Sequence, residues 1–178
     1  TVIANVFAGG RTTDGQAIYS AFPIDPGLAG DNWATWKFAN SVALDPLSVG
    51  TVFSVPPGMF DPLKVDINAR LPLFSATNDT CRESGQSLMT PPGHQNPVNL
   101  ARLKDRGEKM VVYHGVADAI FSAEDTRQWM LRLDKAMGGK ADSFARYFPV
   151  PGMAHCSGGP STDQFDLLTP LVNWVENG

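Results

Sequence analysis

A histidine and a cysteine stand side by side at positions 155 and 156, within the stretch VPGMAHCSGGP at residues 150–160. The chain has only three histidines and two cysteines among its 178 residues, so a His and a Cys would rarely be neighbours by chance, and the pairing suggests a specific role. Glycine and proline on both sides disfavour a helix or a strand there. The stretch therefore predicts a loop that holds His155 in place, with His155 as a candidate base.

An acidic residue follows an earlier strand-like run in a similar way. Asp118 lies in YHGVADAIFS, four residues after His114 and just past the apolar run at residues 109–115. If both runs are neighbouring parallel strands, Asp118 and His155 lie at the same edge of a sheet, where open α/β sheets carry their working residues. An acid that orients a histidine lets the other ring nitrogen accept a proton from a nucleophile.

Other interpretations of these residues remain open. Asp118 is also suited to a turn, and His155 to a buried, hydrogen-bonded structural role. Asp125 is a weaker candidate acid, because it lies in the first turn of a predicted helix. His114 is expected to be structural at the end of its strand, and no role is assigned to His94.

The nucleophile that this pair would serve is missing. The order Asp then His, each after a late strand, matches the end of α/β-hydrolases, whose serine comes earlier on a G-x-S-x-G turn. No G-x-S-x-G occurs in the sequence. Ser157 is two residues from His155 and is poorly placed to reach its imidazole. The sequence therefore predicts an incomplete catalytic triad.

The second part of the chain supplies the elements that would position these residues. It reads as a strand at 109–115, a helix with Ser122 as N-cap, a strand at 143–150 and a C-terminal helix within 163–178 that Pro170 should kink or restart. This alternation is typical of a parallel sheet covered by helices, so the predicted fold class is α/β. The inward faces are expected to carry Trp129, Met130, Leu133 and Met137 in the first helix, and Phe165, Leu168, Val172 and Val175 in the second.

The first hundred residues have a different character. Ten of the fourteen prolines fall there, and the turn-forming segments FPIDPGLAG and VPPGMFDP interrupt any long periodicity. Within it, DNWATWKFANSVAL predicts a short helix whose Trp33 and Trp36 must pack on something. We expect residues 1–100 to form an irregular cap and residues 101–178 the sheet and its helices, with the boundary near residues 106–108.

Composition narrows the possible partners. A net charge of −4 and an isoelectric point near 5.2 argue against a nucleic-acid surface, which needs clustered lysine and arginine. No run approaches the roughly 20 apolar residues of a membrane span, so no membrane partner is expected. Two cysteines without C-x-x-C spacing indicate neither a disulfide framework nor a zinc site, although a bridge between Cys81 and Cys156 remains open. The sequon at Asn78 is weak evidence for export.

Three separated motifs occur in an order that resembles the tannase and feruloyl esterase family: KMVVYHGVADAIFSAEDT, FARYFPVPGMAHCSGGP and DQFDLLTPLVNWVENG. The resemblance implies a secreted or periplasmic serine esterase of the α/β-hydrolase fold, with His155 as general base and Asp118 as its orienting acid. It also implies that Cys156 forms a disulfide with a cysteine that directly precedes the serine, outside this chain. The serine, the oxyanion hole and a structural calcium loop would lie in the remaining N-terminal part of the enzyme. No cofactor or metal is expected in catalysis, and residues 1–100 would be part of the lid.

The same resemblance places Trp36 over an aromatic substrate, where a stacked ring adds about 1 kcal/mol beyond its buried area. The alternative is that Trp33 and Trp36 are lid core. No arginine occurs between Arg11 and Arg70, so the lid lacks an evident arginine for a free carboxylate. A neutral or phenolic aromatic acyl group is therefore expected.

Two further hypotheses belong to other classes. Because the nucleophile is missing, the chain by itself would be a non-catalytic domain that binds an aromatic ligand or a partner chain. A metal site of Asp118, His155 and Cys156 is less favoured, because a fourth ligand is lacking.

Overall fold

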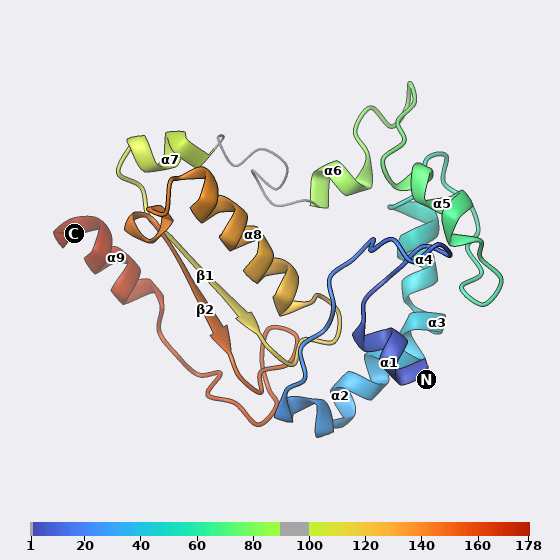
Figure 1. The fold of residues 1–178 in the computed structure, drawn as a ribbon, viewed down its shortest axis with the longest axis horizontal. Coiled ribbons are helices and arrows are strands. Elements are labelled where there is room, and N and C mark those ends of the chain that lie inside the picture. The colour runs from blue at the N-terminus through green and yellow to red at the C-terminus, as the bar shows by residue number, and fades with distance from the viewer. Residues whose placement is uncertain (1, 90–99) are drawn as a thin grey trace.

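A two-stranded parallel sheet forms the centre of the second part of the molecule in the computed structural model, which describes residues 2–89 and 100–178 (Figure 1). β1 (Met110–Gly115) pairs with β2 (Ala145–Val150), so that Met110 lies opposite Ala145 and Gly115 opposite Val150. The two carboxyl ends therefore meet at one edge. Both predicted strands are confirmed, starting one or two residues later than expected, and with the covering helices they make an α/β arrangement.

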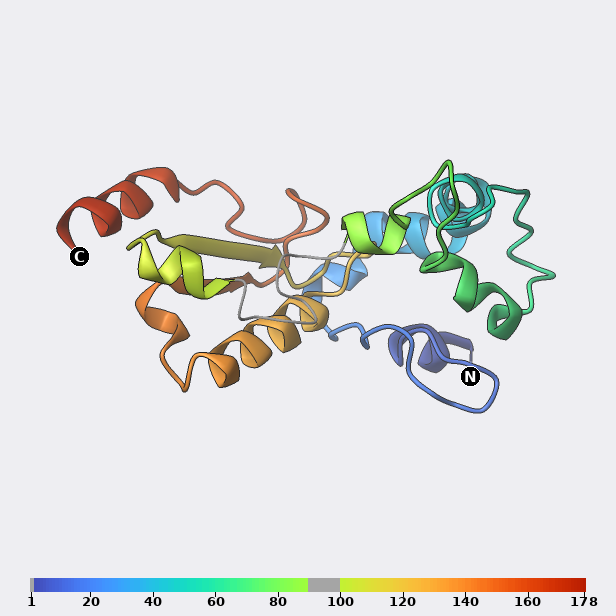
Figure 2. The ribbon, with the colours of Figure 1, turned by 90° about the horizontal axis from the view of Figure 1, so that it is seen from above.

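Helix α8 (Ala123–Ala136) connects the two strands and covers one face of the sheet, while α9 (Leu168–Asn177) lies on the other (Figure 2). Ser122 is the N-cap of α8, as predicted, and its Oγ accepts the amide of Glu124 at 3.1 Å. The helix stops before Gly138, whose φ of 68° suits glycine and breaks the helical path.

The apolar side of α8 forms the main core. Trp129 and Leu133 are buried against Phe144, and Met130 and Met137 pack around them, so the predicted inward face of this helix is confirmed. The cluster also includes α7 (Ala101–Asp105) through Leu100 and Leu103, and the 3-10 helix η4 (Ala141–Ser143) through Ala141. This core fixes the sheet from the α8 side.

The predicted inward face of α9 is wrong, although the ring of Phe165, just before the helix, packs on Tyr113 of β1 with centroids 5.2 Å apart. Its expected core residues are exposed, at 40% for Phe165, 70% for Leu168, 44% for Val172 and 55% for Val175. The half-buried positions are instead Leu167, Leu171 and Trp174. Both sets have the spacing of one helix face. The second set faces the sheet, where the guanidinium of Arg146 on β2 lies 3.9 Å from the Trp174 ring centroid.

Pro170 lies in the first turn of α9, where a missing amide hydrogen has no helical partner to lose. The helix begins at Leu168, later than the expected range, because Asp166 Oδ1 accepts the amides of Leu168 and Thr169 at 2.9 and 3.1 Å. Pro170 therefore lies at the start of the helix, and the residues DQFDL at 163–167 before it are non-helical.

Short helices make up nearly half of residues 2–89. They are α1 (Val2–Phe7), η1 (Pro26–Ala29), α2 (Asp31–Ala34), the π-helix η2 (Thr35–Asn40), α3 (Ser41–Ala43), α4 (Asp45–Thr51), α5 (Ile67–Phe74) and α6 (Gly85–Met89). The predicted tryptophan helix is thus present in pieces. Trp33 is buried and stacks on Phe7 with ring centroids 5.0 Å apart, whereas Trp36 is half-buried. The division at residues 106–108 stays a prediction.

One N-terminal segment is joined to the start of α8. Tyr19 Oη accepts the amide of Ser122 at 2.8 Å, Ser122 Oγ donates to the carbonyl of Ala21, and Ser20 Oγ donates to Asp125 Oδ1 at 2.8 Å. Burial raises the pKa of Tyr19 to about 12. These bonds attach residues 19–21 beside the loop that carries Asp118.

Among the residues that the structure describes, no helix combines the length and the apolar character required to cross a membrane.

Candidate active site

Asp118 lies three residues after β1, in a tight turn that its own carboxylate stabilises. Oδ1 accepts the amides of Ile120 and Phe121 at 2.7 and 2.9 Å. The side chain is 4% exposed. This turn fixes one carboxylate oxygen and leaves Oδ2 to face the edge where both strands end.

His155 meets that second oxygen. Its Nδ1 lies 2.9 Å from Asp118 Oδ2, across 37 residues of sequence. Because a carboxylate can only accept, Nδ1 carries the proton and Nε2 of a neutral ring is an acceptor. His155 is one-third exposed, and none of the described residues hydrogen-bonds Nε2. The structure thus brings together the two residues that sequence analysis placed on one edge.

His114 also binds the carboxylate. Its Nε2 lies 3.3 Å from Asp118 Oδ2 and 3.1 Å from the carbonyl of Phe121, both of which are acceptors, so Nε2 carries the proton. Nδ1 then accepts from Thr126 Oγ1 at 2.8 Å. With both ring nitrogens occupied, His114 is a structural partner of Asp118, as the sequence suggested.

The environment keeps Asp118 ionised. Burial alone would raise the pKa of this carboxyl, but the hydrogen bonds from His114, His155 and the two loop amides outweigh it and hold the pKa below its usual value. A carboxylate that is charged at neutral pH can orient a neutral imidazole and stabilise the imidazolium formed when His155 accepts a proton.

A pocket of about 240 Å³ opens at this pair. Tyr113, Gly115, Phe121, Met153 and Cys156 line it together with the three residues of the hydrogen-bonded group. The Phe121 ring packs at 5.6 Å from the His155 ring and tilts by 55°. None of the eight described residues lining the pocket carries a hydroxyl suited to attack an ester, since Tyr113 is the sole phenol among them and serine is absent.

Cys156 lies beside His155 in an unusual backbone conformation. Its φ of 65° places it in the left-handed region, which β-carbon-bearing residues seldom adopt. Cys156 and Cys81 are both free, so the bridge between them that the sequence left open is not formed in the described part of the chain. The pairing of Cys156 with a cysteine outside this chain stays a prediction.

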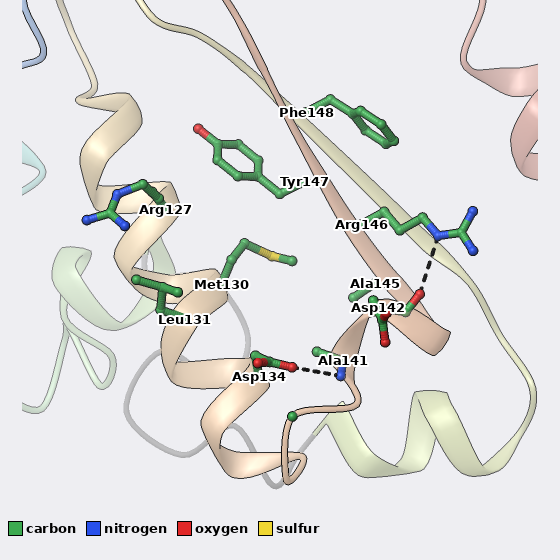
Figure 3. A pocket seen from close by; sticks show the side chains of 11 residues that line it. Arg127, Met130, Leu131, Asp134, Ala141, Asp142, Ala145, Arg146, Tyr147 and Phe148 are labelled. Carbon is green, nitrogen blue, oxygen red and sulfur yellow. Dashed lines mark hydrogen bonds between the residues drawn. The ribbon is translucent and has the colours of Figure 1, made fainter.

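Trp36 does not belong to this pocket. It lies on η2 and is not among the described residues that line the space next to His155. A larger pocket, of about 540 Å³, also lies elsewhere, between α8, η4 and β2 (Figure 3). In Figure 3, Met130 extends from α8 toward β2, and Tyr147 extends from β2 toward α8. Neither member of the Asp118–His155 pair lines it.

Two residues of the site were missed by the sequence analysis. Phe121 carries no motif that marks it as a neighbour of His155. Asp25, in the turn sequence IDPG, binds the loop that carries His155, through the amide of Gly152 at 3.0 Å. The aspartate before a proline indicated a turn, but nothing local indicated a contact 127 residues away.

No group of three or more His, Cys, Asp and Glu side chains within residues 2–89 and 100–178 is arranged to hold a metal ion, so Asp118, His155 and Cys156 do not form such a site. His94 lies outside the described residues.

Known proteins are similar to this chain in sequence and in fold. Residues 12–178 match the family model described as tannase and feruloyl esterase. Mono(2-hydroxyethyl) terephthalate hydrolase of Piscinibacter sakaiensis is 39% identical over 202 aligned positions, covering 100% of this chain and 33% of the relative. Feruloyl esterase B of Aspergillus niger is 33% identical over 108 residues, covering 47% of this chain and 21% of the relative.

A solved structure extends the comparison. The crystal structure of feruloyl esterase B from Aspergillus oryzae superposes with a TM-score of 0.68 at 23% identity, over 98% of this chain and 35% of that one. That similarity shows a shared fold. The chain spans a third or less of the length of the two curated relatives above. Because the family model covers nearly all of it, the chain belongs to the tannase and feruloyl esterase family.

Proposed function

We propose that the complete protein is a serine carboxylic ester hydrolase that acts on esters of aromatic acids, of the feruloyl, galloyl or terephthalate type. Residues 101–178 are the C-terminal part of its α/β-hydrolase sheet, and residues 1–100 are part of its lid. The names of its relatives, a feruloyl esterase and a terephthalate-ester hydrolase, support this substrate class.

The observation that carries the proposal is the 2.9 Å hydrogen bond from His155 Nδ1 to Asp118 Oδ2. It occupies Nδ1 and leaves Nε2 of His155, a residue that lines the pocket at the carboxyl edge of the sheet, without a hydrogen bond to any described residue, while a buried, charged acid holds the other nitrogen. In such a pair, the free Nε2 can accept the proton of a nucleophile that lies next to it.

In the proposed mechanism, a serine from the remaining N-terminal part of the enzyme attacks the ester carbonyl while His155 Nε2 takes its proton. Asp118 holds the resulting imidazolium, and an oxyanion hole outside this chain stabilises the tetrahedral intermediate. His155 then returns the proton to the alcohol as it leaves. Water repeats the cycle on the acyl-enzyme and releases the aromatic acid.

No cofactor takes part in these steps. A structural calcium would be held by residues outside this chain, as the family resemblance implies. Cys156 would join a cysteine next to the serine, and a secreted or periplasmic location would favour that disulfide. Intact mass measured without reductant tests this pairing.

Trp36 is proposed to cover the aromatic acyl group when the lid closes over the pocket. It is half-buried on η2, so part of its ring is available for contact. The absence of arginine between Arg11 and Arg70 favours a neutral or phenolic ring over one that bears a carboxylate. Comparing methyl ferulate with a terephthalate monoester measures this preference.

The central experiment measures kcat of the full-length enzyme on feruloyl and p-nitrophenyl esters. His155→Ala and Asp118→Asn should each lower kcat by about a thousandfold or more, with the thermal transition retained. Asp125→Asn is the matched control, since this neighbouring carboxylate bonds Ser20 instead of the histidine, and its kcat should stay within a few-fold of the wild type. Near-normal turnover by either of the first two variants would refute the assignment.

A second candidate function rests on the lack of a serine in the pocket lining. The chain by itself would then bind an aromatic ligand, or the rest of the enzyme, without catalysing hydrolysis. Assays of the isolated chain on the same esters distinguish the two functions. Turnover without any added chain would contradict the placement of the serine outside it.

A further inference from the structure

We propose that Asp25 is a positioning residue, whose buried carboxylate in the lid segment fixes the loop that carries His155. The inference rests on the proposed function, because it assigns the loop a catalytic histidine. It adds a role for the lid segment in aligning the catalytic groups.

The carboxylate of Asp25 bridges two segments that are far apart in sequence. Oδ1 accepts the amide of Gly27 at 2.8 Å and that of Gly152 at 3.0 Å, while Oδ2 lies 3.2 Å from the same Gly152 amide. Asp25 is 8% exposed, and its partners among the described residues are backbone amides. A buried carboxylate is costly unless hydrogen-bonded, so these contacts are the means by which the charge is tolerated.

Gly152 is a sensitive position in the His155 loop. Its φ is 74°, and a β-carbon there would lie 2.3 Å from the carbonyl oxygen of Pro160, so the loop folds closely on itself at this point. His155 follows three residues later. The carbonyl of Met153, next to Gly152, accepts the amide of Ala117 at 3.1 Å, which ties the loop to the residue before Asp118.

The turn after Asp25 touches both catalytic loops. A β-carbon on Gly27 would lie 2.4 Å from Ala117 Cβ and 2.6 Å from the carbonyl oxygen of Gly152. The lid turn therefore packs against the residue next to Asp118 and against the loop of His155 at once. Loss of the Asp25 bonds would free this contact and let the imidazole shift relative to Asp118.

A comparison within the chain separates this role from ordinary capping. Asp66 starts α5 in the same manner, with Oδ1 accepting the amides of Asn68 and Ala69, but it is exposed and its amide partners are local. Asp25 adds a buried bond to Gly152 across 127 residues. A cap alone does not require that contact.

The test uses the full-length enzyme with Asp25→Ala, Asp25→Asn and the control Asp66→Ala. Misplacement of a catalytic group by about 1 Å costs up to 100-fold in rate. We expect Asp25→Ala to lower kcat by about 10- to 100-fold with KM changed less than threefold, because the reacting geometry suffers more than substrate binding. Asp25→Asn keeps one accepting oxygen and should recover most of the loss. Asp66→Ala should keep wild-type kcat.

The kcat of a double variant, Asp25→Ala with Asp118→Asn, decides whether Asp25 acts through the catalytic pair. If Asp25 acts through the Asp118–His155 pair, Asp25→Ala should cost much less in an Asp118→Asn background than in the wild type. Full additivity, or equal kcat for Asp25→Ala and Asp66→Ala, would overturn the proposal. Should Asp25→Ala fail to fold, Asp25→Ser decides, because a serine still accepts the Gly27 amide but is too short to reach that of Gly152. Wild-type kcat for Asp25→Ser would count against the role. High turnover by His155→Ala would instead overturn the proposed function itself.

Discussion

The imidazole of His114 donates a hydrogen bond to the carboxylate of Asp118 over 3.3 Å, from a position four residues earlier in the chain. The accepting oxygen, Oδ2, is the one that also holds His155. Asp118 is thus supported by His114 while it orients His155. Mutation of each histidine in turn can separate these two roles.

Replacing His114 with glutamine should affect stability more than catalysis. The change weakens a half-buried network and should lower the free energy of unfolding by about 1–3 kcal/mol, as measured by urea denaturation. The bond from His155 to Asp118 remains, so kcat should fall less than about tenfold. Thr126→Val, which removes the partner of His114 Nδ1, is the control and should leave kcat unchanged. A loss of kcat equal to that of His155→Ala would show that His114 is the base.

Ser122 joins the start of α8 to the segment of residues 19–21. It is fully buried, caps α8 by accepting the Glu124 amide, and donates to the carbonyl of Ala21. Ser122→Ala should cost about 2 kcal/mol, because it removes both the helix cap and the hydrogen bond from the buried Ser122 hydroxyl to the carbonyl of Ala21. Ser143→Ala is the matched control, since that exposed hydroxyl donates only to the carbonyl of Lys140, and it should cost less than about 0.5 kcal/mol. Equal transition midpoints for both variants would contradict this role.

Local signals explain which parts of the fold could be predicted from the sequence. The apolar, β-branched run of β1 and the serine cap and apolar stripe of α8 are properties of neighbouring residues, so both elements were found. Asp118 and His155 were found because each follows a strand. Their hydrogen bond then required only that the two strands be adjacent and parallel.

Other features were hidden because the sequence allows more than one solution. α9 has apolar residues around most of its circumference, so 167, 171 and 174 fit an inward face as well as 168, 172 and 175. In the structure the first of these sets faces the sheet, with Trp174 against Arg146 of β2. Similarly, Asp25, Asp45 and Asp61 each precede a proline, but only Asp25 of these is buried. Packing against Gly152 selects it, and no local pattern encodes that contact.

Cys156 allows the strain of its backbone to be measured apart from its thiol. At a φ of 65°, a residue with a β-carbon is disfavoured and glycine is not. Cys156→Gly should therefore be more stable than Cys156→Ala by about 1 kcal/mol in chemical denaturation. Both variants lack sulfur, so any disulfide contribution cancels between them. Equal stabilities would show that the loop relaxes when the side chain changes.

Because of Lys37, we expect the free energy of unfolding to rise at alkaline pH. Its Nζ lies 3.3 Å from the Phe22 ring centroid, and burial lowers its pKa to about 8, against the opposing attraction of Asp118 and Asp45. In the unfolded chain the pKa returns to about 10.4. Between these values the unfolded state binds more protons, so the free energy of unfolding should increase with pH, and below about 8 the contribution should be flat.

The difference in the free energy of unfolding between the wild type and Lys37→Met isolates this contribution. Tyr19 and the other titrating groups are present in both proteins, so their contributions cancel. From pH 8 to pH 10.5 the wild type should gain about 1 kcal/mol relative to the variant, a value reduced because the side chain is only half-buried. Urea denaturation at several pH values measures it. Lys64→Met is the control, since Lys64 is 85% exposed and should give a difference that does not change with pH. A constant difference for Lys37→Met as well would mean that the ammonium keeps its water in the folded protein.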